Sequence, residues 1–212
     1  MNKFNDTTFL TGINYLKSKD KVFQGLYENI GILSFKPRDF DLTEFCKIII
    51  GQQLSSKAAD TIFARLQNFL EQEKIKAESI INLNSQSFRE IGISFGKSKY
   101  LVQFAKKITE YPRYFEELKV LSSDEAYNHL IQLQGVGPWT ANIIQLFHLE
   151  HLDVFPFGDV SLEKVYSKLY NTKLKIGDKN SYEQINWASP YKGILAIYLW
   201  KYLDMGLFER KK

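Results

Sequence analysis

Apolar residues recur every three to four positions along most of this chain, and sustained alternation of apolar and polar residues is rare. This spacing places apolar side chains on one face of a helix. It predicts helices over residues 9–16, 22–27, 42–50, 56–70, 97–109, 123–133, 138–148, 162–169 and 192–203. Turn signals rich in Gly, Pro and Asp separate these segments. The pattern therefore predicts an all-α fold with short connections.

The composition indicates a folded, soluble chain. Its 212 residues are 44% hydrophobic and 15% aromatic, enough for one domain or two closely packed lobes. The single cysteine, Cys46, lies in an apolar stretch and predicts a buried thiol without an intramolecular disulfide. No leader pattern or membrane-spanning apolar run is present in the sequence. We expect a cytoplasmic, monomeric protein that binds no membrane and needs no cofactor.

The charge is mildly basic, with a net charge of +4 and a pI near 8.9. Such a balance permits DNA binding without arguing for it. Lys97 and Lys99 stand in an acid-free stretch that starts at the loop 93–96 and leads into a predicted helix. They are candidates for phosphate contacts, and an ordinary solvated helix face is the alternative.

The segment 133–141, Leu-Gln-Gly-Val-Gly-Pro-Trp-Thr-Ala, carries a glycine turn at the start of a predicted helix. Glycine allows a close approach of the backbone to a ligand, and Pro138 suits the first helical position. Backbone N–H groups at a helix N-terminus favour a phosphate, which positions DNA without reading its sequence. The alternative is a tight turn between helices with no ligand. The candidate DNA contacts here are Gly135, Val136, Gly137 and Thr140.

Three separated motifs carry a family resemblance. The segment 133–141, followed by Asp-Val-Phe-Pro-Phe-Gly-Asp at 153–159, resembles the helix-hairpin-helix Gly/Pro-Asp superfamily of DNA glycosylases. Within it the chain is most similar to the 3-methyladenine DNA glycosylase II branch. Residues 49–59 resemble the central helix-turn segment of that branch, and residues 190–200 resemble its C-terminal helix. The resemblance covers residues 20–206, approximately.

The resemblance implies a two-lobed helical glycosylase of base excision repair, in which lobe A covers about 43–140 and lobe B about 1–42 plus 141–212. Its partner is duplex DNA that contains damaged bases. Its substrates are alkylated purines, 3-methyladenine and 7-methylguanine, which leave after the base flips out of the helix. Two alternatives remain: a related glycosylase for oxidised or deaminated bases, and a DNA-binding module without catalysis.

Asp159 is the catalytic carboxylate under this resemblance. An alkylated purine already carries positive charge, so one carboxylate can stabilise the developing oxocarbenium sugar and help to activate water. The structural alternative is a helix cap, and the two roles are compatible. The nearest competitor, Asp153, is given a structural or phosphate-loop role.

Trp139 distinguishes two kinds of glycosylase. Strand-nicking relatives carry a lysine at the corresponding position, and an indole has no nucleophilic amine. A monofunctional, hydrolytic enzyme is implied. The iron-sulfur members of the superfamily need four cysteines, so the one cysteine here excludes such a cluster.

The resemblance also implies a base pocket and an inserted side chain. Aromatic walls hold a flipped base, and an indole face attracts a cationic one; the candidates are Trp139, Trp200 and Tyr191, with core packing as the alternative for each. Gln53 matches the position at which the family fills the gap left by the flipped nucleotide. Gln52 and Ser55 are further candidate DNA contacts, although both glutamines could instead tie the turn. The hairpin backbone is a candidate site for a monovalent cation, and no side-chain metal site is expected.

Overall fold

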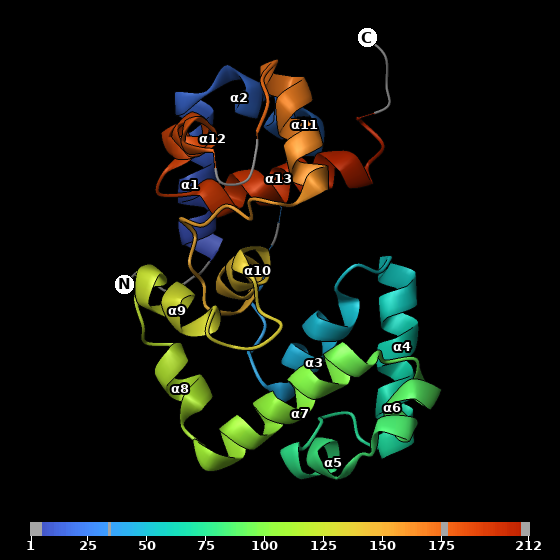
Figure 1. Cartoon of the computed structure of the whole chain (residues 1–212). Helices are drawn as coiled ribbons and strands as arrows, with labels where there is room; N and C mark the ends of the chain where they lie inside the picture. The colour runs from blue at the N-terminus through green and yellow to red at the C-terminus, as the bar shows by residue number, and fades with distance from the viewer. Residues whose placement is uncertain (1–5, 34, 175–177, 209–212) are drawn as a thin grey trace. The chain divides into compact units, whose positions relative to one another are not determined.

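The computed structural model describes residues 6–33, 35–174 and 178–208 (Figure 1). Within these residues the secondary structure is entirely helical, and the all-α prediction is confirmed. The chain divides into two compact units. Unit 1 is Met1–Arg38 with Asn142–Lys212, and unit 2 is Asp39–Ala141. These bounds lie close to those expected for lobes B and A.

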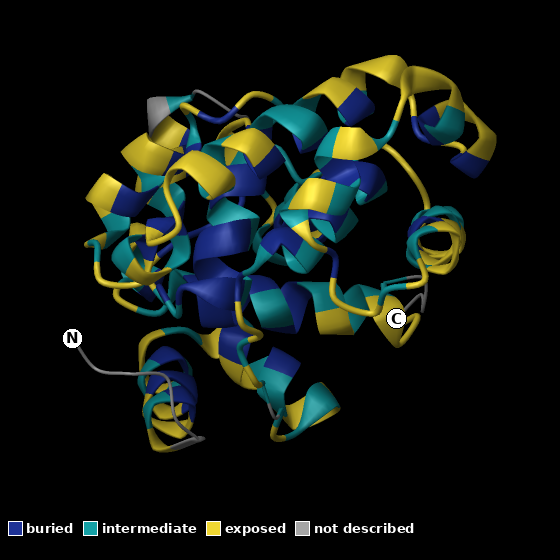
Figure 2. Cartoon of the chain, turned by 90° about the horizontal axis from the view of Figure 1, so that it is seen from below, coloured by how far each residue is buried: buried dark blue, intermediate teal, exposed yellow. Residues whose placement is uncertain are grey.

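Unit 1 is organised around its C-terminal helix, α13. That helix packs against α1, α2 and α11, and five of its residues from Ile194 to Leu199 are fully buried. Single helices carry buried residues on one side and exposed residues on the other, as the three- and four-residue spacing predicts (Figure 2). The helices of this unit are α1 (Asp6–Lys19), α2 (Lys21–Ile30), α11 (Val160–Tyr170), α12 (Lys179–Ile185), the 3-10 helix η1 (Asn186–Ala188) and α13 (Lys192–Asp204), with the larger part of α10 (Pro138–His148).

Tyr198 is a fully buried residue of the unit 1 core. Its hydroxyl donates a 2.9 Å hydrogen bond to the Gly31 carbonyl. Burial raises the pKa of Tyr198 to about 12, whereas an unfolded tyrosine titrates near pH ~10. Between these values the unfolded chain binds fewer protons than the folded chain, so stability falls as the pH rises.

Tyr198→Phe is therefore expected to lower the free energy of unfolding by about 1 kcal/mol at pH 7, because one buried hydrogen bond is lost. The difference from the wild type should shrink above pH ~10, because the variant has no phenol to ionise at this position. Urea unfolding at pH 7 and at pH 10.5 measures both effects. A difference that stays constant between the two pH values would contradict this account.

Unit 2 is built on α7, which packs against α3, α5 and α6. The Phe45 and Phe104 rings stack at 3.8 Å between centroids, and Cys46 beside them is fully buried, as predicted. Burial raises the pKa of the Cys46 thiol. The helices of this unit are α3 (Leu42–Gly51), α4 (Ser56–Leu70), α5 (Ala77–Asn82), α6 (Ser85–Ile91), α7 (Phe95–Glu110), α8 (Tyr114–Leu118) and α9 (Ser123–Leu130), with the first turn of α10.

Side-chain caps explain where the helices of unit 2 begin. The side chains of Asp41, Ser55 and Ser94 accept backbone N–H bonds at the starts of α3, α4 and α7. Short polar side chains at this position satisfy N–H groups that the helix leaves without partners. These caps place the loops before α4 and α7, which the candidate site uses. Across the described ranges, no helix combines the length and the apolar character needed to cross a membrane.

Candidate functional site

The glycine hairpin has the predicted form, a turn that ends at the first residue of α10, Pro138. The Val136 N–H donates to the Leu133 carbonyl at 3.0 Å, which closes the turn. Gly135 has a φ of +85°, and a Cβ there would lie 2.4 Å from Cδ2 of Tyr100. The backbone conformation and the tight space both require glycine at this position.

Two predicted DNA contacts of the hairpin are buried residues. The Val136 side chain is buried at 5% exposure, and its N–H is already bonded within the turn. Thr140 is 3% exposed, and its hydroxyl oxygen accepts a 3.1 Å hydrogen bond from Nε2 of Gln52. Burial leaves both side chains little surface for a phosphate. A DNA contact by either residue remains a prediction.

Gln52 joins the α3–α4 loop to the hairpin. Its Nε2 donates to the Gly135 carbonyl at 2.8 Å as well as to Thr140. The amide nitrogen of Gln52 thus binds the hairpin, and a DNA contact by this residue remains a prediction. The alternative, that one of the two glutamines ties the turn, is confirmed for this one.

The residues after Gln52 are exposed. Gln53 has a left-handed backbone with a φ of +59°, and it is followed by Leu54 at 40% exposure. Ser55 caps α4, because its hydroxyl accepts the Ala58 N–H at 3.3 Å. The loop presents the Gln53 side chain outward within unit 2, as an inserted residue requires. Insertion of Gln53 and a DNA contact by Ser55 remain predictions.

Lys97 binds backbone carbonyls of its own unit. Its Nζ donates to the carbonyls of Ile50 and Gln52, both at 2.8 Å. Burial lowers the pKa of this ammonium group. The ammonium caps the C-terminal end of α3, where carbonyls lack helical partners, and a phosphate contact by Lys97 remains a prediction. Lys99 is exposed, and its phosphate contact remains a prediction.

Asp159 begins α11 in unit 1. Its Oδ1 accepts the backbone N–H groups of Ser161 at 2.9 Å and of Leu162 at 3.0 Å. The preceding Gly158 donates its N–H to Glu163 Oε1 at 3.0 Å, which closes the turn from the other side. The capping role is confirmed, and both bonds reach one carboxylate oxygen. The side chain is half-buried and fixed in orientation by the helix.

Asp153 makes structural contacts, which fit one of the two roles expected for it. Its Oδ2 accepts a 2.8 Å hydrogen bond from the Ser189 hydroxyl, and its Oδ1 lies 3.2 Å from Nζ of Lys192. These contacts tie the 153–159 segment to Ser189 and to Lys192, the first residue of α13. Of the aspartates at the two ends of this segment, Asp153 is the one that stabilises the local structure.

The aromatic candidates fall into both units. Trp139, the second residue of α10, is half-buried in unit 2. Trp200 is half-buried in unit 1, with its ring centroid 5.7 Å from that of Phe147. Tyr191 packs edge-on against Tyr15 at 5.4 Å. The Tyr191 ring is used in this packing, and its role in a base pocket remains a prediction. Trp139 and Trp200 remain predictions.

Two of the three histidines, His148 and His151, take part in hydrogen bonds to oxygen atoms within unit 1. His148 Nδ1 lies 3.1 Å from the Arg38 carbonyl, and His151 Nδ1 lies 3.0 Å from Gln145 Oε1. Throughout the part of the chain that the structure describes, no three His, Cys, Asp or Glu side chains converge as metal ligands. A cation at the hairpin backbone remains a prediction.

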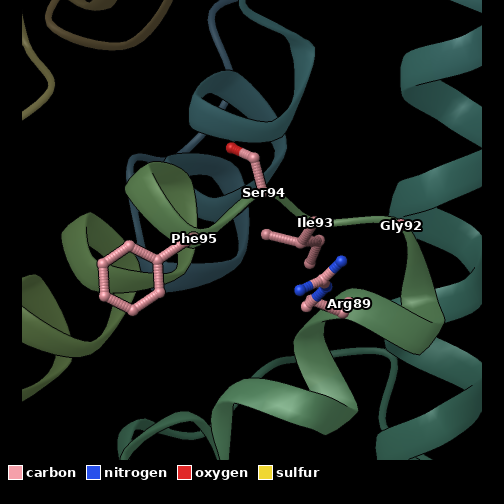
Figure 3. A pocket seen from close by; sticks show the side chains of 5 residues that line it. All are labelled: Arg89, Gly92, Ile93, Ser94 and Phe95. Atoms are coloured by element: carbon pink, nitrogen blue, oxygen red, sulfur yellow. The ribbon is translucent and has the colours of Figure 1, made fainter.

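Sequence reasoning missed one exposed feature of unit 2, the loop that leads into α7. A surface depression there is lined by Arg89, Gly92, Ile93, Ser94 and Phe95 (Figure 3). Phe95 is 70% exposed at the first position of α7. The available signal was an aromatic residue directly after a capping serine, in the loop that precedes Lys97 and Lys99.

A protein-family model described as "HhH-GPD superfamily base excision DNA repair protein" matches residues 46–190. A putative DNA-3-methyladenine glycosylase of Bacillus subtilis is 26% identical over 164 residues, which cover 74% of this chain and 57% of that relative. DNA-3-methyladenine glycosylase 1 of Schizosaccharomyces pombe is 29% identical over 160 residues, 74% of this chain and 70% of the relative. The chain thus spans little more than half of the first relative.

Solved structures show the same fold. The chain is similar to a DNA-3-methyladenine glycosidase of Bacillus halodurans, with a TM-score of 0.78, 27% identity, and coverage of 99% of this chain and 95% of the other. It also resembles the Schizosaccharomyces pombe 3-methyladenine DNA glycosylase solved in complex with abasic DNA. That match has a TM-score of 0.78 at 24% identity, covering 95% and 100% of the two chains.

Proposed function

The chain belongs to the HhH-GPD superfamily of base excision DNA repair proteins, and from this premise we propose that it is a monofunctional DNA glycosylase for alkylated purines. It hydrolyses the N-glycosidic bond of 3-methyladenine and 7-methylguanine in duplex DNA. One observation carries the proposal: the Asp159 carboxylate, inside the matched segment, is held by two backbone N–H groups at the start of α11. The relatives named DNA-3-methyladenine glycosylase support the substrate class.

The chemistry asks little of the protein beyond a fixed negative charge. An alkylated purine is cationic and leaves readily, so positive charge develops on the sugar as the bond breaks. A carboxylate held in place stabilises that charge without reorganising at the moment of reaction. Asp159 is such a group, and it also helps to orient the attacking water.

The other candidate residues of the chain bind the DNA. The hairpin at Gly135 and Gly137 receives a phosphate, and Lys99 adds a second phosphate contact. The target nucleotide flips out of the stack, and the exposed Gln53 fills the space that it leaves. Trp139 and Trp200 supply indole faces that attract the positively charged base.

Single-turnover release of 3-methyladenine and 7-methylguanine from alkylated duplex DNA tests the proposal. The wild-type protein is expected to release both bases and to leave an intact abasic strand. Release of neither base, with DNA still bound, would indicate a DNA-binding module without catalysis. Release of oxidised or deaminated bases instead would move the protein to a different class of glycosylase.

Trp139→Lys is expected not to create efficient strand nicking. A lysine forms a Schiff base with the sugar only when its pKa and its approach to the sugar carbon are both tuned, and one substitution supplies neither. Borohydride trapping of a covalent protein–DNA adduct measures the outcome. An adduct formed by the wild-type protein would contradict the monofunctional assignment.

A further inference from the structure

We propose that Lys97 is a positioning residue, which holds the α3–α4 loop so that Gln53 stands ready to enter DNA. The inference rests on the proposed function, because it assigns a role to the loop in base release. Its evidence is a set of contacts inside unit 2 that join three segments far apart in the sequence: the end of α3, the start of α7 and the glycine hairpin.

Lys97 is the third residue of α7, where the positive end of the helix dipole disfavours a cation. Its ammonium group lies instead at the C-terminal end of α3, where it donates to the carbonyls of Ile50 and Gln52 at 2.8 Å each. The half-buried ammonium thus loses water and gains two carbonyl oxygens. Charge-assisted bonds of this kind are stronger than bonds between neutral groups.

Gln52 is held through both its backbone and its side chain. Its carbonyl accepts from Lys97, and its side-chain nitrogen donates to Gly135 and Thr140. Gln53 follows directly, in a left-handed conformation that residues other than glycine adopt infrequently. The backbone bonds of the loop alone are long, at 3.4 Å from the Gln52 N–H to Ile49 and 3.2 Å from Leu54 to Gly51. Lys97 supplies a shorter restraint on the residue before Gln53.

A lysine near DNA can bind a phosphate or position a loop, and the two roles have different effects on binding and rate. A lysine on a phosphate releases counterions, so removing it lowers the slope of log affinity against log salt by about 0.9. A lysine that positions a loop leaves this slope unchanged and acts after binding, on the rate. Misplacement of a reacting group by about 1 Å can cost 10²-fold in rate.

The test compares three variants. Lys97→Met keeps the aliphatic stem and removes the ammonium; Lys97→Arg keeps a donor that can reach carbonyls. Lys99→Met removes an exposed charge two residues away on the same helix.

For Lys97→Met we expect a salt slope equal to that of the wild type, a saturating single-turnover rate lowered 10- to 100-fold, and faster hydrogen exchange of the amides in residues 50–55. Lys97→Arg should restore much of the rate. Lys99→Met should lower the salt slope and leave the exchange of residues 50–55 unchanged.

The proposal is overturned if Lys97→Met lowers the salt slope by about 0.9 with unchanged exchange, since Lys97 would then contact phosphate directly. It is overturned equally by a variant with wild-type exchange and rate. Hydrogen exchange and salt dependence on undamaged duplex DNA need no catalysis. If the wild-type protein releases no alkylated base, the proposed function fails, and these two measurements still decide whether Lys97 holds the loop. A thermal unfolding midpoint for each variant separates global unfolding from release of the loop.

Discussion

Asp159→Asn is expected to slow the single-turnover release of alkylated bases by about 10²- to 10³-fold, because it removes the negative charge that stabilises the developing oxocarbenium. Stability should change little. Asparagine is as good a helix cap as aspartate, and its side-chain oxygen can accept the same N–H groups of Ser161 and Leu162. Affinity for undamaged duplex DNA should also stay near the wild-type value. Release kinetics, urea unfolding and DNA titration measure the three quantities separately.

Two matched variants make the Asp159 result specific. Asp159→Ala removes the cap as well as the charge, and should lower the free energy of unfolding by about 1 kcal/mol more than Asp159→Asn. Asp153→Asn removes the other carboxylate of the same segment, which pairs with Ser189 and Lys192. It should weaken the scaffold and retain the release rate. An Asp159→Asn variant that reacts as fast as the wild type would remove Asp159 from the chemistry.

The sequence predicted the long helices well because their apolar spacing is itself the packing surface. The segment 192–203 became α13, Lys192–Asp204, whose buried face forms much of the unit 1 core. The segment 123–133 was extended too far, since α9 ends at Leu130 and the chain then turns into the hairpin. The helices α5, α6, α8 and α12 were not predicted. Each has five to seven residues, too few to display a helical period.

The candidate site was predictable where a local motif encodes it. The glycine turn and the capping aspartate are set by neighbours within a few residues, and both were identified. The contacts that join Lys97, Gln52 and Thr140 could not be predicted, because each spans a long stretch of chain: 45 residues from Lys97 to Gln52, and 88 from Gln52 to Thr140. Periodicity and composition carry no information about such pairs. The sequence therefore could not show that the fold itself uses these polar side chains.

The two glycines of the hairpin are expected to respond differently to alanine. Gly135→Ala should lower the free energy of unfolding of the protein by about 2–4 kcal/mol, from left-handed backbone strain and overpacking together. The added Cβ would lie 2.4, 2.8 and 2.9 Å from three ring atoms of Tyr100. Moving the turn to relieve this overlap would break the bond from Gln52 to the Gly135 carbonyl. Gly137, by contrast, lacks a left-handed φ, and a Cβ there meets nothing within 4 Å.

Gly137→Ala should consequently keep the free energy of unfolding within about 0.5 kcal/mol of the wild type, while it weakens binding to undamaged duplex DNA, because the new methyl group stands where the backbone approaches a phosphate. Gly135→Ala combined with Tyr100→Ala should relieve the overlap and retain the cost of the left-handed backbone. Urea unfolding and DNA titration of the three variants separate the glycine that the fold needs from the glycine that the ligand needs. A Gly137→Ala protein that binds DNA as the wild type does would place the phosphate away from this turn, and a stable Gly135→Ala protein would contradict the packing of Tyr100 on it.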